Sequence, residues 1–267
     1  MAVIGLHNVS KKLRRYNCRS RWLRREILEY ITRKRQETEW LNVLHEINFE
    51  IEKGESVGIL GVNGSGKSTL LKLIAGIMTP TSGEVTRSGR TCSLLDVGTG
   101  FQEDLTGREN VFLNGSILGL SEKLLKYLMP EIEDYAEIEG FMDTPLRYYS
   151  SGMRARLGFA VAMSANPDIF LIDEVLAVGD EGFRRKCYGR LDTLVSGGTT
   201  VVMVSHDTQA VKRLCNRAIW LENGVVRADG QSSGICEEYV NSFISPSRPV
   251  SVKPGTQEVE EASLHGS

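Results

Sequence analysis

The chain has 267 residues, of which 41% are hydrophobic and 25% are charged. This composition is that of a globular protein with one large or two small domains, and it excludes collagen-like and low-complexity chains. The formal net charge of −2 excludes a general attraction to polyanions, but the charge is unevenly distributed. Residues 11–35 carry eleven Lys and Arg against two Glu, a local charge of +9.

Five cysteines occur at scattered positions, with neither a C-x-x-C pair nor a zinc-like Cys/His spacing. This usage favours reduced, cytosolic thiols. Met1 is followed by no basic-then-apolar leader, and no stretch approaches the roughly 18 apolar residues of a membrane span. We therefore expect neither a secretory leader nor a transmembrane helix, so a membrane role would require a partner or a surface contact.

Hydrophobic periodicity predicts the elements in chain order. The predicted strands span residues 2–9, an edge strand, then 43–51 and 56–60, followed by two apolar runs at 169–172 and 199–204. The predicted helices span residues 69–75, 110–118, 122–133 and 153–163. Because short, wholly apolar strands flanked by helices are typical of strands buried on both faces, the pattern predicts a parallel sheet with crossover helices.

Two further segments depart from this alternation. Residues 19–35 predict a basic amphipathic helix inserted between the first two strands, since Trp22, Ile27 and Ile31 share one helical stripe while the arginines occupy the other side. Residues 246–267 show no period and are rich in proline, serine and glycine, which predicts a disordered tail.

The residues from Gly61 to Ser68 satisfy the pattern G-x-x-x-x-G-K-[ST] between a predicted strand and a predicted helix. In such a loop, backbone N–H groups turn inward around phosphate oxygens, aided by the positive end of the following helix. Lys67 would neutralise the β- and γ-phosphates, and the Ser68 hydroxyl would ligate Mg²⁺. The nucleotide-binding residues predicted here are Gly61, Asn63, Gly64, Ser65, Gly66, Lys67, Ser68 and Thr69.

Polar groups also follow the two apolar runs. Asp173 and Glu174 come directly after the first run, and His206 follows the second. Because parallel strands deliver such groups to one edge of the sheet, Asp173 would reach the Mg²⁺ shell and Glu174 would polarise the attacking water as a general base. His206 would lie where a γ-phosphate sensor is needed.

The order of these motifs resembles that of the ATP-binding-cassette family. Residues 149–153, Tyr-Ser-Ser-Gly-Met, are similar to the family's signature motif, with Tyr for the leading Leu, Ser for the first Gly and Met for Gln. Gln102 lies where the Q-loop glutamine falls, residues 178–180 match the D-loop, and His206 matches the switch histidine. The similarity runs from about residue 2 to residue 244.

This resemblance implies an α/β fold: a RecA-like P-loop NTPase core with a mixed sheet, an N-terminal antiparallel β subdomain and an inserted helical signature subdomain at about 104–163, within one nucleotide-binding domain at 1–245. It implies ATP hydrolysis with Mg²⁺. The catalytic residues would be Glu174, His206, Lys67 and Gln102, and the metal ligands Ser68, Gln102 and Asp173. It also implies a head-to-tail homodimer, in which Ser150 and Gly152 of one copy close over the ATP held by Lys67 of the other.

One position departs from the family pattern. Leu13 stands where the family places an aromatic residue that stacks on adenine. Tyr16 nearby, or Trp40 beyond the insertion, is a candidate substitute, and we assign the role to Tyr16.

Within the family, the segments at 106–111 and 174–180, the signature variant and the inserted helix resemble the ATPases of bacterial polysaccharide exporters. This implies a peripheral subunit on the cytoplasmic face of the cell membrane, partnered by an integral-membrane permease that moves a glycan or glycolipid. The carbohydrate-binding domain of some longer relatives is expected to be absent here.

The alternative is a soluble cassette ATPase acting on nucleic acid or ribosomes, for which the +9 segment is the best support. Such relatives carry coiled-coil arms or two cassettes, and this sequence has neither, so no nucleic-acid partner is expected. The basic helix itself is open to three interpretations: a solvated face, an anionic-lipid contact, or a gate beside the permease. Trp22 among Arg21, Arg24 and Arg25 favours the membrane side.

Deleting residues 19–34 tests this placement. Basal ATP hydrolysis should remain largely present, while its stimulation by the permease should weaken, because the segment would contact the membrane side and not the nucleotide. The measurement is the hydrolysis rate with and without permease. Loss of basal hydrolysis would instead assign the segment to the fold.

Overall fold

The computed structural model describes residues 1–15, 39–94, 100–173 and 181–244. The predicted basic helix at 19–35 and the predicted tail at 246–267 lie outside the described residues. Among the helices within these ranges, none combines the length and apolar composition that crossing a bilayer requires.

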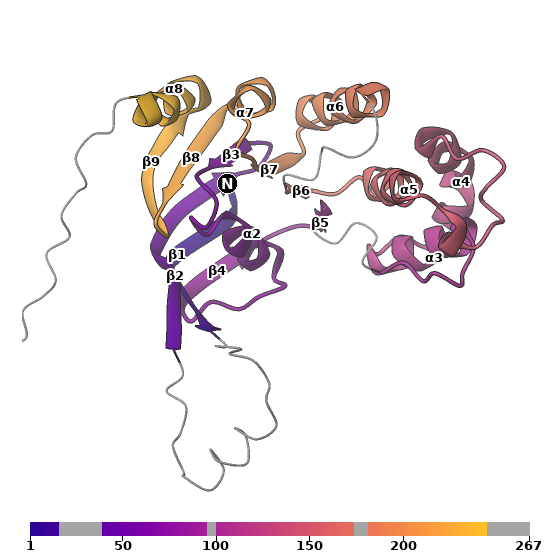
Figure 1. The fold of residues 1–267 in the computed structure, drawn as a ribbon, viewed down its shortest axis with the longest axis horizontal. Helices are drawn as coiled ribbons and strands as arrows, with labels where there is room; N and C mark the ends of the chain where they lie inside the picture. The colour runs from indigo at the N-terminus through magenta and orange to yellow at the C-terminus, as the bar shows by residue number, and fades with distance from the viewer. Residues whose placement is uncertain (16–38, 95–99, 174–180, 245–267) are drawn as a thin grey trace, which may run out of the picture.

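The centre of the molecule is a six-stranded sheet in the order β5-β6-β7-β3-β8-β9 (Figure 1). In that order the strands are Thr91–Ser93, Ile169–Ile172, Thr200–Val204, Ser56–Leu60, Arg217–Glu222 and Val225–Gln231. All neighbours pair in parallel except β8 and β9, which are antiparallel. The predicted parallel sheet is therefore confirmed, and β9 makes it mixed.

Helices cover both faces of this sheet, which explains the unbroken apolar runs. Helices α6, α7 and α8 lie over one face and α2 over the other (Figure 1). Their bounds are Glu181–Ser196, Thr208–Leu214, Ser232–Ile244 and Lys67–Ala75. Along β6, Phe170 and Ile172 pack into one core while Ile169 and Leu171 pack into the core that contains α2. Because successive side chains of a strand point to opposite faces, such a strand is apolar at every position.

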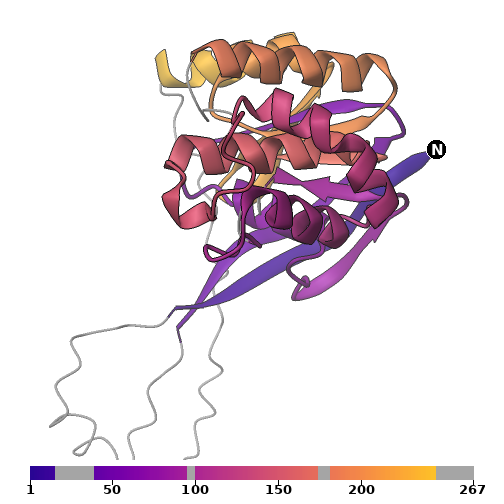
Figure 2. The same ribbon diagram turned by 90° about the vertical axis from the view of Figure 1, so that its right-hand side faces the viewer.

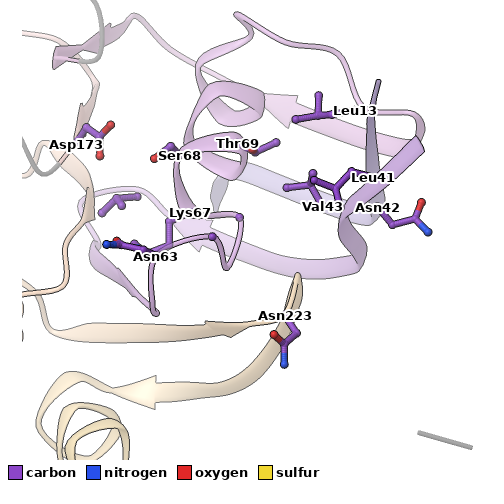
Figure 3. Close-up of a pocket in the computed structure, with 13 residues that line it drawn as sticks. Leu13, Leu41, Asn42, Val43, Asn63, Lys67, Ser68, Thr69, Asp173 and Asn223 are labelled. Carbon is purple, nitrogen blue, oxygen red and sulfur yellow. The ribbon is translucent and has the colours of Figure 1, made fainter. Parts of the chain in front are cut away.

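This topology places polar groups together at one edge of the sheet. Lys67 begins α2 directly after β3 and its loop, and Asp173 directly follows β6. Because β3 and β6 flank β7 in parallel, both residues lie at the carboxyl edge, where Figure 3 shows Asp173 beside the start of α2.

A second, antiparallel sheet packs against the other side of α2 and has the order β2-β1-β4. Its strands are Glu39–Glu52, Ala2–Arg15 and Ser82–Arg87. The prediction of an edge strand at 2–9 is wrong, since β1 lies in the middle of this sheet. Strand β4, the second neighbour of β1, was not predicted from the sequence. This strand reads Ser-Gly-Glu-Val-Thr-Arg and has only one apolar side chain, so it gives little hydrophobic signal.

Three helices, with a short 3-10 turn before the last of them, form a separate layer beside the sheet (Figures 1 and 2). They are α3, Gly107–Ile117; α4, Glu122–Ala136; η2, Leu146–Tyr148; and α5, Ser151–Ser164. Helix α3 begins three residues before the predicted start, because Thr106 and Glu109 form a reciprocal capping box. Ser150 caps α5 by accepting a hydrogen bond from the Met153 N–H.

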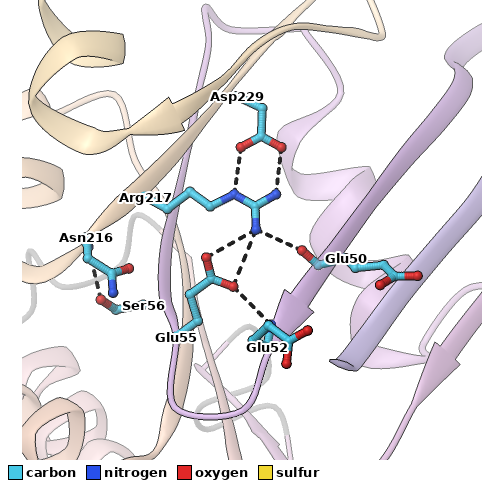
Figure 4. A network of polar contacts seen from close by, with 7 residues as sticks. All are labelled: Glu50, Glu52, Glu55, Ser56, Asn216, Arg217 and Asp229. Carbon is cyan, nitrogen blue, oxygen red and sulfur yellow. Dashed lines mark hydrogen bonds and ion pairs between the residues drawn. The ribbon is translucent and has the colours of Figure 1, made fainter. Parts of the chain in front are cut away.

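Arg217 joins the two sheets (Figure 4). Its guanidinium donates two hydrogen bonds of 2.6 Å to Asp229 on β9, two of 3.1 and 3.3 Å to Glu55 before β3, and one of 2.8 Å to the Glu50 carbonyl on β2. The hydrogen bonds with Asp229 are the largest cause that raises the pKa of Arg217. Since the three side chains are no more than 28% exposed, the network is shielded from water more than a surface ion pair.

Replacing Arg217 by Ala should lower the free energy of unfolding by about 2 kcal/mol, because it leaves two partly buried carboxylates unpaired. Arg108→Ala is the matched control: it breaks a two-bond pair with Asp143, whose side chain is 80% exposed, and should lower the free energy of unfolding much less, because water and salt screen an exposed pair. Denaturant unfolding of both variants measures the difference. Equal losses would show that the Arg217 network is no stronger than a surface pair.

Candidate functional site

The loop between β3 and α2 depends on two glycines. At Gly61, where φ is 157°, an added Cβ would collide with the Leu221 carbonyl oxygen and lie 2.6 Å from Ser65 Oγ. Gly66 precedes α2 with φ of 104°, a conformation that residues with side chains rarely adopt. The glycines thus let the chain turn sharply close to the Leu221 carbonyl on β8 and start α2 at the end of the loop.

The N-terminus of α2 is left open to an anion. No side chain caps the helix at Gly66, and its first turn contains no acidic residue. Ser65 is 2% exposed, and its Oγ has no hydrogen-bond partner among the described residues. Since the first N–H groups of a helix have no partner within the helix and carry its positive dipole, this arrangement suits a phosphate group.

The ammonium group of Lys67 lies inside the loop, where the residue is only 6% exposed. Its Nζ donates hydrogen bonds of 2.7 Å to the Gly61 carbonyl and 3.1 Å to the Val62 carbonyl. Burial lowers the pKa of Lys67, and the negative charge of Asp173 acts in the opposite direction. The loop therefore holds a desolvated cation that further negative charge would stabilise.

Asp173 responds in the complementary way. Burial raises the pKa of its carboxyl group, and the charges of Lys67 and Lys72 partly offset that effect. An additional cation beside Asp173 would also lower the pKa of its carboxyl group and favour the ionised form, because opposite charges attract.

These groups line a cavity of about 530 Å³ (Figure 3). The predicted site residues that line it are Asn63, Gly64, Gly66, Lys67, Ser68, Thr69 and Asp173. Gly61 and Ser65 are buried behind this lining. The volume falls within the range of about 300 to 1,000 Å³ that small-molecule sites occupy.

The other end of the cavity is built by residues that the sequence did not identify as a set. Leu13 on β1 pairs directly with Leu41 on β2, and both line the cavity with Asn42, Val43 and Asn223. Because this wall arises from strand pairing across an insertion, no local sequence signal could reveal it. Trp40, the second candidate for adenine stacking, is 59% exposed and does not line the cavity. Tyr16 lies outside the described residues.

The remaining predicted residues lie elsewhere. Gln102, in the turn before α3, and His206, after β7, are both exposed and not part of the cavity lining. Ser150 and Gly152 stand at the start of α5, whose other end leads into β6. Neither residue lines the cavity. Glu174 and residues 178–180 lie outside the described residues.

The cavity also suits a magnesium ion. The Ser68 hydroxyl and the Asp173 carboxylate line the same space, and oxygen donors of this kind are the ligands that Mg²⁺ prefers, together with phosphate oxygens. Gln102, the third ligand implied by the resemblance, is not brought to this position by the described fold.

Comparisons with known proteins point to one family. The sequence profile described as ABC transporter matches residues 44–177, half of the chain. The O-antigen export system ATP-binding protein RfbB of Myxococcus xanthus is 45% identical over 90% of this chain, and the chain spans 56% of that protein's length. The teichoic acids export ATP-binding protein TagH of Shouchella clausii is 39% identical over 88% of this chain and 64% of its own length.

The fold agrees with these sequence matches. A dimeric ATP-binding cassette, solved in a post-hydrolysis state with ADP and phosphate, superposes with a TM-score of 0.68 at 25% identity, over 86% of this chain and 98% of its own. It confirms the predicted fold class, a P-loop NTPase core with a mixed sheet. The fold that the motif order predicted therefore contains the phosphate loop, the acidic end of β6 and the helical layer. The chain belongs to the ABC transporter family of ATPases.

Proposed function

We propose that this chain is the ATP-hydrolysing subunit of an ABC transporter that exports a polysaccharide or a lipid-linked glycan. The cavity that combines the uncapped start of α2 with Lys67 and Asp173 is the observation that carries the ATPase part. The export part is supported by the likeness to proteins named for O-antigen and teichoic acid export.

In this proposal the loop at 61–69 binds the triphosphate. The backbone N–H groups at the start of α2 and the Lys67 ammonium would face the phosphate oxygens, whose negative charge would raise the pKa of Lys67 against the lowering effect of burial. Leu13, Leu41 and Val43 supply an apolar wall for the base, and Tyr16 remains our candidate for stacking on adenine.

Ser68 and Asp173 would hold Mg²⁺, with Gln102 as a further ligand. The ion, when bound, neutralises charge on the transferring phosphoryl group. The Glu174 carboxylate would take the proton of the attacking water, and His206 would contact the γ-phosphate. Catalysis therefore rests on positioning and on charge stabilisation.

Two copies would be needed for a complete site. Ser150 uses its hydroxyl to cap α5, and the first turn of that helix holds no acidic residue, so its N–H groups are suited to the γ-phosphate of a partner copy. Within one copy, neither Ser150 nor Gly152 lines the cavity that holds Lys67. The contacts between the start of α5 and the γ-phosphate exist only before hydrolysis. They would close the dimer, and their loss after hydrolysis would open it.

The partners follow from the export function. An integral-membrane permease would bind the chain at the cytoplasmic face of the cell membrane and carry the glycan or glycolipid.

The domain would run from residue 1 to about residue 245, with residues 104–163 as its helical subdomain, and the segment 246–267 would be a disordered tail.

Glu174→Gln should leave ATP binding intact and slow hydrolysis by about 100-fold or more, because the variant has lost its general base. It should also trap an ATP-dependent dimer visible by light scattering. Lys67→Ala should neither bind ATP tightly nor dimerise, while Lys53→Ala, in the turn before β3, should behave as the unmodified protein. Undiminished hydrolysis by Glu174→Gln would remove that residue from its role.

Purification from the native membrane in mild detergent tests the export assignment. The chain should come with a multi-span permease and a glycolipid, and that permease should stimulate ATP hydrolysis after reconstitution. Salt-sensitive binding to DNA or RNA, with no response to a permease, would instead support the nucleic-acid alternative.

A further inference from the structure

We infer that Asn110 is a positioning residue for Gln102: its side chain fixes the Gln102 backbone and ties it to the segment that carries Ser150. The inference rests on the proposed function, since it gives Asn110 a role in ATP hydrolysis only through Gln102.

Asn110 lies in the first turn of α3 and has no exposed surface. Its Oδ1 accepts a hydrogen bond of 2.8 Å from the Gln102 N–H. Its Nδ2 lies within hydrogen-bond distance of three carbonyls, at 3.0 Å from Gln102, 3.1 Å from Leu105 and 2.9 Å from Thr106. The side chain therefore holds both polar groups of the Gln102 backbone, as a neighbouring strand would.

The set of partners requires a carboxamide. One backbone N–H and three backbone carbonyls surround the end of the Asn110 side chain. The side chain therefore has to accept one hydrogen bond and donate others, which a carboxamide can do. An aspartate would keep the bond to the Gln102 N–H and lose the donated bonds, and an alanine would lose all of them. Buried backbone groups left without partners are unfavourable, so the turn would then move to find others.

The same turn is fastened on its other side to the residues before α5. The Leu146 N–H donates to the Leu105 carbonyl and the Arg147 N–H to the Glu103 carbonyl, both at 2.9 Å. Arg154, four residues after Ser150, pairs with Glu103 at 2.8 Å. Residues 103–106 and the start of α5 therefore form one body, and Asn110 attaches Gln102 to it.

This arrangement has a functional consequence. Gln102 is exposed, while the N–H and C=O of its backbone are both bound by one buried side chain. A displacement of Gln102 towards the nucleotide would therefore be shared with Ser150 through residues 103–106. Without the Asn110 amide, Gln102 would keep its peptide bond to Glu103 and the 3.2 Å hydrogen bond from the Leu105 N–H to its carbonyl, but its N–H would lose its partner and its coupling to Ser150 would weaken.

The first test compares Asn110→Ala with Asn114→Ala. Asn114 lies one turn further along α3, and its amide donates to the Asn110 carbonyl at 3.1 Å, so it is a matched control. Asn110→Ala should lower kcat by about 10- to 100-fold, the range found for residues that orient ligands. Its Tm should fall below that of Asn114→Ala, because more buried hydrogen bonds are lost, while its affinity for ATP without Mg²⁺ should stay close to that of Asn114→Ala. If Asn110→Ala lost ATP affinity by the same factor as it lost kcat, the role of Asn110 would be merely structural and the inference would be overturned.

The second test is a double-mutant cycle with Gln102→Ala. If Asn110 acts through Gln102, adding Asn110→Ala to Gln102→Ala should change kcat by less than about twofold, because nothing remains to be positioned. A full additional decrease would overturn the inference while leaving the role of Gln102 intact. Unchanged hydrolysis by Gln102→Ala alone would overturn the proposed role of Gln102, and the inference with it. Should Asn110→Ala fail to fold, Asn110→Asp takes its place in the same cycle.

Discussion

A buried ammonium group at the carboxyl edge of a parallel sheet is the constraint on which the site depends. Lys67 is 6% exposed, with two backbone carbonyls and the charge of Asp173 in its surroundings. A cation in such a place loses hydration and gains from every further negative charge nearby. The loop is thus built to bind an anion, and the strands β3, β6 and β7 decide where that anion lies.

The two sheets are held together so that residues from both line one cavity. Besides Arg217, the turn between β8 and β9 connects them: the Gly224 N–H donates to the Ser65 carbonyl at 3.1 Å, and the Gly224 carbonyl accepts from the His45 N–H at 2.8 Å. This turn therefore ties the phosphate loop to β2, which carries Leu41 and Val43 of the cavity wall. A ligand bound there contacts groups from both sheets.

The helical layer is organised around polar links. Ser150 caps helix α5, and the Asn110 and Glu103 contacts join the start of this helix to the turn that contains Gln102. Because several of these links are hydrogen bonds to backbone groups, they fix the relative positions of the two segments. The start of α5 and the turn that contains Gln102 therefore hold a fixed arrangement within the layer.

The sequence by itself determined the phosphate loop, the acidic end of β6, the buried strands β3, β6 and β7 and the family, because short motifs and apolar runs depend on neighbours in the chain. It missed the buried strand β8. It misplaced β1 at an edge, since the polar β4 gives little hydrophobic signal. Only the tertiary structure decided that Leu13 meets Leu41 in the cavity wall and that Asn110 holds Gln102. These contacts depend on strand register and on a buried hydrogen-bond set, neither of which local periodicity encodes.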